Sequence, residues 1–172
     1  AVGGRTILDH LLEQIQAIPG VEAVYLITNS RFVAHFEAWR RGRHGGVDVD
    51  IIDNGTVSNE DRLGAVGDIR FAVEARNIDD DLLVCAADNI LQFSLADFVA
   101  AFRAHTTAHV CVRSIEDVED RRRRGIVLLD AYDRVLEFEE KPEDPKSEWA
   151  VPPIYFYPRA TVPRIGEYLE DG

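Results

Sequence analysis

Lysine is almost absent from this chain, and both of its lysines lie in one short segment. Of the 19 basic side chains, only Lys141 and Lys146 are lysine, and the others are arginine. Lysine offers a compact point charge and arginine a planar fork, so the two are not interchangeable at a tight anion site. Lys141 stands between Glu140 and Pro142. In a proline-stiffened turn the ammonium can neutralise a phosphate, and the carboxylate can accept sugar hydroxyls. The alternative is a solvated strand end with scattered charge.

A second candidate site is a polar pair that follows the apolar run at residues 81–87. Asp88 and Asn89 come directly after this run, which is typical of a strand covered on both faces. Ligands of open α/β sheets bind beyond the carboxyl ends of strands, where a carboxylate can hold Mg²⁺ together with waters and substrate phosphates. The alternative is a plain Asp-Asn turn, which the pattern alone favours.

A third candidate is the segment 54–64, which follows an expected strand and leads into an expected helix. Gly64 allows a close approach of the backbone to a ligand, and free N–H groups at a helix start suit anions or base edges. The alternative is structural, because Ser58 and Asp61 have the spacing of a capping box that starts the helix without any ligand.

The elements that must position these residues follow from hydrophobic periodicity. Helical stripes predict helices over 6–18, from 32, after 58, from 94 and over 159–170. Strands are expected at 21–28, 47–52 and 81–87, and then at 108–114, 125–130, 134–140 and 149–157. The alternation of helix and strand in the first half predicts an α/β protein with a mostly parallel sheet, and the second half adds antiparallel strands. Since such sheets normally open on a strand, we expect that a first strand and the loop after it are missing.

Composition limits the function classes. The length of 172 residues fits one domain, and the formal net charge of −12 argues against a nucleic-acid binder or a binder of anionic membranes. No signal peptide and no membrane-spanning run are recognised, so we expect a cytoplasmic protein. Cys85 and Cys111 are expected to be reduced and buried, and the four arginines at 121–124 to form a solvated face. His105 and His109 are poor metal-ligand candidates.

Five segments in this order resemble the sugar-1-phosphate nucleotidylyltransferases, the family that includes glucose-1-phosphate thymidylyltransferase. They are "VGGRTILDHLLEQI", "AADNI", "RRGIVLLD", "LEFEEKPEDPKS" and "IYFYPRATV". The resemblance spans nearly the whole chain, and "EEKP" followed by a tyrosine-containing strand is its most specific part. It implies a Rossmann-like three-layer nucleotidyltransferase fold with a mixed, mostly parallel sheet. Residues 1–172 would then be one catalytic domain that lacks its first strand, its phosphate loop and its C-terminal end.

The resemblance also implies roles for the candidate residues. Family members join a nucleoside triphosphate to a sugar 1-phosphate with Mg²⁺ and release pyrophosphate. By resemblance, Asp88 is the metal ligand and Lys141 contacts the sugar phosphate, and these two are the catalytic residues. Glu140 and Gly125 would bind the sugar. The segment at 58–64, with Asn59 and Gly64, would border the nucleotide base, and Asn89 would complete the substrate contacts. Glucose 1-phosphate with dTTP or UTP is the first expectation, and homo-oligomer formation is left open.

Departures from the family pattern keep two other functions open. The family's Gly-rich triphosphate loop should precede Ala1, Ala87 replaces a common glycine, and Pro152-Pro153 stands where the sugar pocket usually has a small residue and glycine. A non-catalytic nucleotide- or sugar-binding module of the same fold is the first alternative. A nucleotidyltransferase for a non-sugar alcohol phosphate is the second.

Overall fold

The computed structural model describes residues 2–103 and 105–171, with the backbone alone for 168–171. By its internal contacts the chain divides into two compact units. Unit 1 comprises residues 1–81, 87–106 and 158–172, and unit 2 comprises residues 82–86 and 107–157. Each unit is described by itself. Within the described residues, none of the helices has the length and apolar character needed to cross a membrane.

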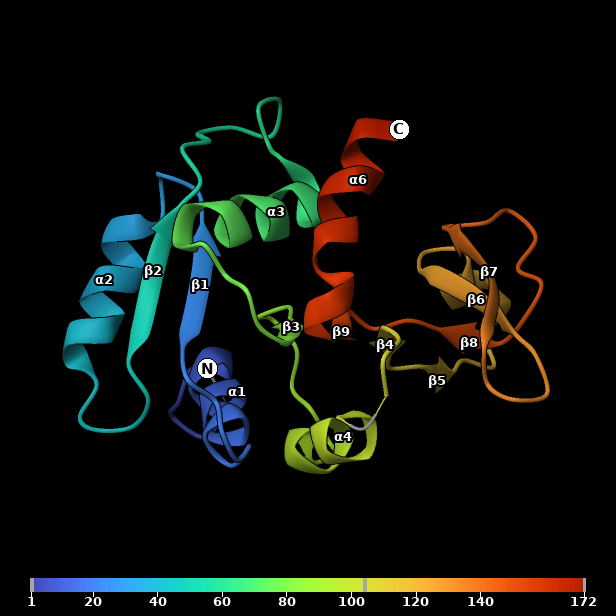
Figure 1. The fold of residues 1–172 in the computed structure, drawn as a ribbon, viewed down its shortest axis with the longest axis horizontal. Coiled ribbons are helices and arrows are strands. Elements are labelled where there is room, and N and C mark those ends of the chain that lie inside the picture. The colour runs from blue at the N-terminus through green and yellow to red at the C-terminus, as the bar shows by residue number, and fades with distance from the viewer. Residues whose placement is uncertain (1, 104, 172) are drawn as a thin grey trace. The chain divides into compact units, whose positions relative to one another are not determined.

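Unit 1 contains a two-stranded parallel sheet and most of the helices (Figure 1). Its elements are α1 (Ile7–Gln16), β1 (Val24–Thr28), α2 (Val33–Gly42), β2 (Val49–Asp53), α3 (Gly64–Arg76), α4 (Leu95–Phe102), η1 (Arg159–Thr161) and α6 (Pro163–Asp171). Strands β1 and β2 pair in register from Val24 with Val49 to Thr28 with Asp53. Helix α2 connects them and lies alongside β2, so this half of the unit is a β-α-β crossover.

The first helix of unit 1 begins as the sequence predicts. The Thr6 hydroxyl accepts from the Asp9 backbone N–H (3.1 Å), and the Asp9 carboxylate accepts from the Thr6 N–H (2.9 Å), which completes a capping box. Its apolar stripe buries Leu12 against Leu26 and Val49 of the two strands. One core cluster of this unit therefore lies between α1, α2 and the parallel pair.

The prediction that Ser58 and Asp61 start a helix is wrong. The two residues do hydrogen-bond, since the Ser58 N–H donates to Asp61 Oδ1 at 2.8 Å, but the helix α3 begins only at Gly64. Gly64 has a φ of +76°, which lies outside helical geometry, so the helix cannot extend back toward Ser58. Leu63, expected on the buried stripe, is 43% exposed because it precedes the helix.

Unit 2 is built from short antiparallel strands (Figure 1). Its elements are β3 (Leu82–Cys85), β4 (His109–Val110), β5 (Arg113–Ser114), α5 (Val118–Arg121), β6 (Gly125–Leu129), β7 (Val135–Glu140), β8 (Trp149–Ala150) and β9 (Ile154–Tyr157). They form two sheets with strand orders β3-β9-β4 and β5-β8-β6-β7. Ile115, Ile126 and Ala150 form a buried cluster of this unit.

The predicted mostly parallel sheet is not confirmed by the described strands. Only β1 and β2 pair in parallel, and all other strand pairs are antiparallel. The reason is that β3, expected to continue the parallel series, pairs instead with the late strand β9. All four residues of β3 are partly buried, so both faces of the strand are partly covered, as expected.

Two of the four strands predicted in the second half are each divided. The segment 149–157 becomes β8 and β9, because Pro152 and Pro153 have no N–H to donate to a ladder. Likewise 108–114 becomes β4 and β5, which belong to different sheets. The hairpin of β6 and β7 forms as predicted, with a register shift next to Leu129.

Candidate active site

Unit 2 brings Gly125 next to Glu140 and Lys141, which lie far from it in the sequence. Gly125, the first residue of β6, pairs directly with Glu140, the last residue of β7. The N–H of the next residue, Lys141, donates to the carbonyl oxygen of Arg124 (3.0 Å). The three residues assigned by resemblance to the sugar and its phosphate therefore lie at one end of one hairpin.

The neighbouring side chains leave no room for a side chain at position 125. A Cβ atom added there would lie 2.8 Å from two carbons of the Phe138 ring and 3.2 Å from Glu140 Oε2. Distances under 3.0 Å are essentially never seen for a real Cβ. Glycine therefore lets the Phe138 ring and the Glu140 carboxylate approach the strand backbone.

The backbone of Lys141 has an unusual conformation. Its φ is +50°, a region that residues other than glycine rarely adopt, at a cost of about 1–3 kcal/mol. The hydrogen bond to Arg124 on one side and Pro142 on the other hold it there. Lys141 Nζ lies 3.0 Å from Glu140 Oε1, and both side chains are more than half exposed. The exposed Lys141 ammonium on a strained backbone, next to the Glu140 carboxylate, suits a site that binds an anion carrying hydroxyl groups.

Lys146 has different surroundings. Its Nζ lies 2.5 Å from Glu137 Oε1 and 3.0 Å from Glu139 Oε1, and the hydrogen bonds to Glu137 and then Glu139 raise the pKa of Lys146. On a strand, Glu137 and Glu139 face away from the side that Glu140 occupies. Lys146 thus pairs with two carboxylates of β7.

The arginine run 121–124 supports the loop that carries Lys141. Arg122 Nε donates to the carbonyl oxygen of Glu143 (2.8 Å), and the Arg124 carbonyl accepts from Lys141. Arg124 also pairs with Asp120. The expectation of a solvated face is therefore only partly right, because these arginines tie the loop after β7 to the end of helix α5.

Tyr155 of β9 was not singled out from the sequence as a candidate. Its phenol is half-buried, and its pKa is raised first by burial and then by the negative charge of Glu140. The Tyr155 phenol is therefore a neutral hydrogen-bond donor within the electrostatic influence of Glu140. The tyrosine-containing strand of the resemblance was the only signal, and it did not choose between Tyr155 and Tyr157.

The base-site candidates lie in unit 1, beyond the carboxyl end of β2. Asn59 is exposed, and Gly64 has open space around the position of a Cβ. The segment is anchored at its start: Asn54 Nδ2 donates to Asp68 (2.7 Å), and Asn54 Oδ1 accepts from the buried Thr56. Residues 58–64 thus form a mostly exposed segment that is anchored through Asn54 and leads into α3 at Gly64.

Asp88 and Asn89 follow β3 and belong to unit 1. Asn89 Nδ2 donates to Asp88 Oδ1 (2.9 Å), and the Asp88 side chain is exposed. Among the described residues, no group of three or more His, Cys, Asp or Glu side chains is placed so that it could hold a metal ion. One exposed carboxylate is compatible with Mg²⁺, which binds through one or two carboxylates and otherwise takes water and phosphate oxygens. The donor set therefore fits a magnesium ion that arrives with a phosphorylated substrate.

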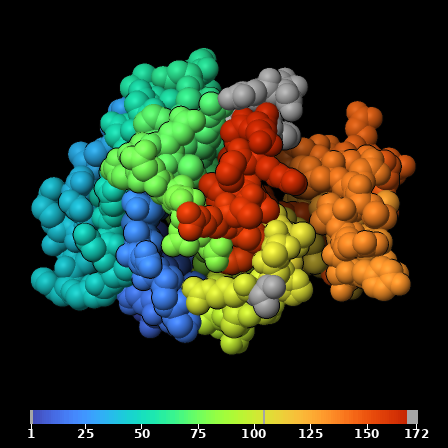
Figure 2. Space-filling model, in the orientation of Figure 1, coloured from blue at the N-terminus to red at the C-terminus, as the bar shows by residue number. Residues whose placement is uncertain are grey.

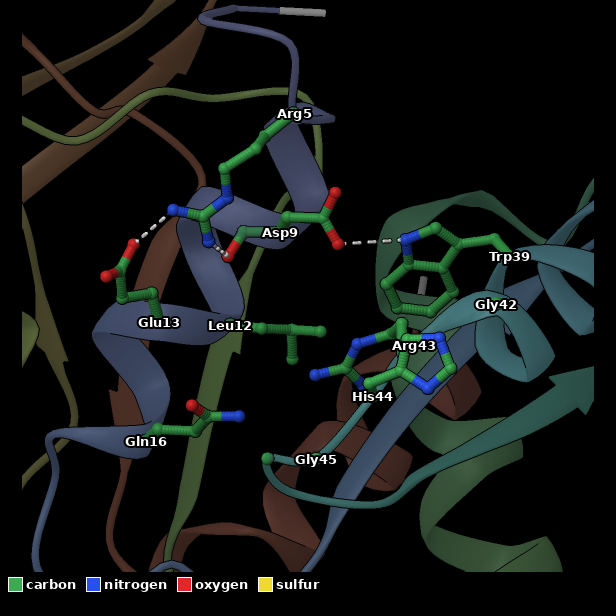
Figure 3. Close-up of a pocket in the computed structure, with 11 residues that line it drawn as sticks. Arg5, Asp9, Leu12, Glu13, Gln16, Trp39, Gly42, Arg43, His44 and Gly45 are labelled. Carbon is green, nitrogen blue, oxygen red and sulfur yellow. Dashed lines mark hydrogen bonds and ion pairs between the residues drawn. The ribbon is translucent and has the colours of Figure 1, made fainter.

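A cavity of unit 1 lies elsewhere, with a volume of about 580 Å³, between α1 and the turn after α2 (Figure 3). This turn precedes β2, whereas the base-site loop follows it. Charged side chains that line the cavity already have partners within its wall: Arg5 pairs with Glu13 (2.8 Å), and Asp9 accepts from the Trp39 indole (3.0 Å). Arg43 lies over the Trp39 ring. A wall whose charges satisfy one another offers little to a charged substrate.

Comparisons with known proteins agree with the predicted resemblance. The family model for nucleotidyl transferases matches residues 1–172. Mannose-1-phosphate guanylyltransferase of Mycobacterium tuberculosis is 33% identical over 97% of this chain and 44% of its own length. Glucose-1-phosphate thymidylyltransferase of Streptomyces antibioticus is 28% identical over 91% of this chain and 42% of its own length. The chain thus spans less than half of these curated relatives.

A solved structure shows the same fold. A UDP-glucose pyrophosphorylase complexed with UDP-glucose superposes with a TM-score of 0.73 at 14% identity, covering 94% of this chain and 67% of that one. The α/β nucleotidyltransferase fold and the resemblance to sugar-1-phosphate nucleotidylyltransferases are confirmed. Because the family match extends over residues 1–172, this chain belongs to the nucleotidyl transferase family.

Proposed function

We propose that the protein transfers a nucleotidyl group from a nucleoside triphosphate to a sugar 1-phosphate. A phosphate oxygen of the sugar 1-phosphate bonds to the α-phosphorus while the bond from that phosphorus to the bridging oxygen breaks. The products are a nucleoside diphosphate sugar and pyrophosphate. The observation that carries the proposal is the group formed by Gly125, Glu140 and the strained Lys141. Glucose 1-phosphate with dTTP or UTP is the proposed substrate pair.

The proposed chemistry needs charge neutralisation more than a base. The nucleophile is an anion at neutral pH, and it must approach an anionic triphosphate in line. Lys141 would hold the sugar phosphate, and the exposed Glu140 would accept sugar hydroxyls. The phosphate then competes with Glu140 for the ammonium, which frees the carboxylate for the sugar. Positioning of this kind supplies much of the rate enhancement in such transfers.

Residues of unit 1 would act on the nucleotide. Asp88 would hold Mg²⁺, which when bound neutralises charge on the triphosphate and the leaving pyrophosphate. The loop that contains Asn59 and Gly64 would border the base through its exposed backbone N–H groups. Asn89 donates to Asp88 and so would orient the carboxylate.

The two lysines provide a test with an internal control. Full-length protein is assayed for pyrophosphate release with Mg²⁺ and a panel of triphosphates and sugar or alcohol phosphates. Lys141→Arg keeps the charge but replaces a point donor by a bulkier planar group, and a displacement of ~1 Å costs on the order of 100-fold in rate. We expect this loss mainly when the sugar phosphate is varied. Lys146→Arg should stay within about twofold, because its carboxylate partners accept either cation.

Two results would overturn the proposal. Absence of pyrophosphate release from the wild type with every pair would exclude the activity and favour a binding module. Equal, small effects of Lys141→Arg and Lys146→Arg would remove Lys141 from the reaction. Turnover only with a non-sugar alcohol phosphate would reassign the acceptor.

A further inference from the structure

An exposed aromatic side chain lies beside the sugar-site residues. Phe138 of β7 is 52% exposed, whereas a phenylalanine on a packed sheet is normally buried. Side chains alternate along a strand, and the pairing from Val127–Phe138 to Gly125–Glu140 is regular, so Phe138 and Glu140 share one face of the hairpin. The space-filling view shows this hairpin, in orange, at the surface of unit 2 (Figure 2).

Gly125 makes room for the Phe138 ring. The absent side chain at position 125 leaves room for the edge of the Phe138 ring, two of whose carbons lie 2.8 Å from where a Cβ would be. Glu140 Oε2 lies against the same vacant position at 3.2 Å. The ring is therefore held next to the carboxylate while half of its surface stays open to solvent.

A flat apolar surface beside a carboxylate matches the two chemical faces of a pyranose ring. A pyranose presents hydroxyl groups around its edge and C–H groups on its faces. An aromatic ring binds C–H groups by dispersion and through its negative π face, and a carboxylate accepts from hydroxyls.

Resting on the proposed function, we infer that Phe138 is a specificity-determining platform on which the sugar ring of the 1-phosphate stacks. Glu140 then accepts from hydroxyls at the sugar's edge, and Lys141 contacts its phosphate.

The platform makes a prediction about sugar stereochemistry. In an α-hexose 1-phosphate the axial phosphate obstructs one face of the ring. The other face carries only axial C–H groups in glucose, but an axial hydroxyl at C4 in galactose and at C2 in mannose. Stacking on Phe138 therefore favours glucose 1-phosphate, because an axial hydroxyl pressed against the ring loses its water without gaining a hydrogen bond.

The same hairpin supplies a matched control. Leu136 is 63% exposed and also lies on β7, but it is the residue skipped at the register shift and has no described contact with Gly125. If exposure of an apolar side chain on this strand were the only relevant property, Leu136→Ala and Phe138→Ala would have the same effect.

The experiment compares Phe138→Ala, Phe138→Tyr and Leu136→Ala with the wild type in full-length protein. Phe138→Ala should lower kcat/KM for glucose 1-phosphate about tenfold, mainly through KM, and leave KM for the triphosphate within about twofold. The ratio of kcat/KM for glucose 1-phosphate to that for galactose 1-phosphate should fall. Phe138→Tyr keeps the ring and should restore both values. Leu136→Ala should behave as the wild type.

Binding of glucose 1-phosphate, followed by saturation-transfer NMR, separates this inference from the proposed function. We expect strong saturation of the sugar C–H protons in the wild type and weak saturation in Phe138→Ala, even without turnover. If neither the wild type nor any variant turns over substrate but the expected difference in saturation is seen, the proposed activity is rejected and the platform is retained. Equal kinetics and equal saturation in Phe138→Ala and Leu136→Ala, or no binding to the wild type, would overturn the platform.

Discussion

Replacement of Gly125 by alanine tests the packing on which the proposed sugar site depends. The added Cβ would lie 2.8 Å from the Phe138 ring, and ordinary contact begins at 3.4 Å, so the ring must retreat by about 0.6 Å. The Glu140 carboxylate, at 3.2 Å, must move by about 0.2 Å. Overpacking typically costs about 1–3 kcal/mol, and the exposed ring can swing outward, so we expect a loss of about 1 kcal/mol.

This displacement should be visible in two assays. In a chain of this size, about 1 kcal/mol lowers Tm by about 2–4 °C. Movement of the ring and carboxylate by a sizeable fraction of 1 Å should lower kcat/KM for the sugar phosphate by about 10- to 100-fold. The KM for the triphosphate should change little, because no residue assigned to the nucleotide touches Gly125 among the described contacts.

Gly166→Ala is the matched control. Gly166 lies in α6, and no atom lies within 4 Å of the position that its Cβ would take. Gly166→Ala should therefore stabilise the protein by about 0.5–1 kcal/mol and leave the kinetics unchanged. A double-mutant cycle completes the test, because Phe138→Ala removes the ring and should make the alanine at position 125 nearly harmless to stability. An equal loss of Tm in both backgrounds, or wild-type kinetics for Gly125→Ala, would refute the reasoning.

Two further predictions follow from the remaining residues. Asp88→Asn should weaken Mn²⁺ binding in the presence of triphosphate, measured by electron paramagnetic resonance, without lowering Tm, since the side chain is exposed; unchanged affinity would assign Asp88 to the turn. Burial raises the pKa of Cys85 to about 12 and that of Cys111 to about 11. Their contribution to stability is complete below the unfolded pKa of about 9 and is lost as pH rises toward the folded values. The free energy of unfolding, measured with urea from about pH 8 to about pH 10.5, should therefore fall less steeply in Cys85→Ala than in the wild type. Equal slopes in the two proteins would contradict this prediction.

The sequence by itself determined the local elements and the family. Helices α1 and α4 begin next to their predicted starts at residues 6 and 94, because their caps, Thr6 with Asp9 and Ser94 with Asp97, join residues three apart. The stripe that buries Leu95 and Val99 is likewise a matter of helical spacing. Five segments in a fixed order, with "EEKP" as the most specific, indicated the family, because residue types and their order are read directly from the sequence.

Only the tertiary structure decided how the sugar-site residues relate to one another. Hairpin register places Glu140 opposite Gly125, and the backbone of Lys141 becomes left-handed because Arg124 binds its N–H across the hairpin. The two lysines differ for the same reason. Glu139 and Glu140 point to opposite faces of β7, so Lys146 pairs with one and Lys141 with the other. Ser58 and Asp61 illustrate a local pattern that does not decide the structure. They form the hydrogen bond that a capping box predicts, but no helix follows at that point. Contacts between distant segments arise from strand pairing and packing, which leave no periodic signal in the sequence.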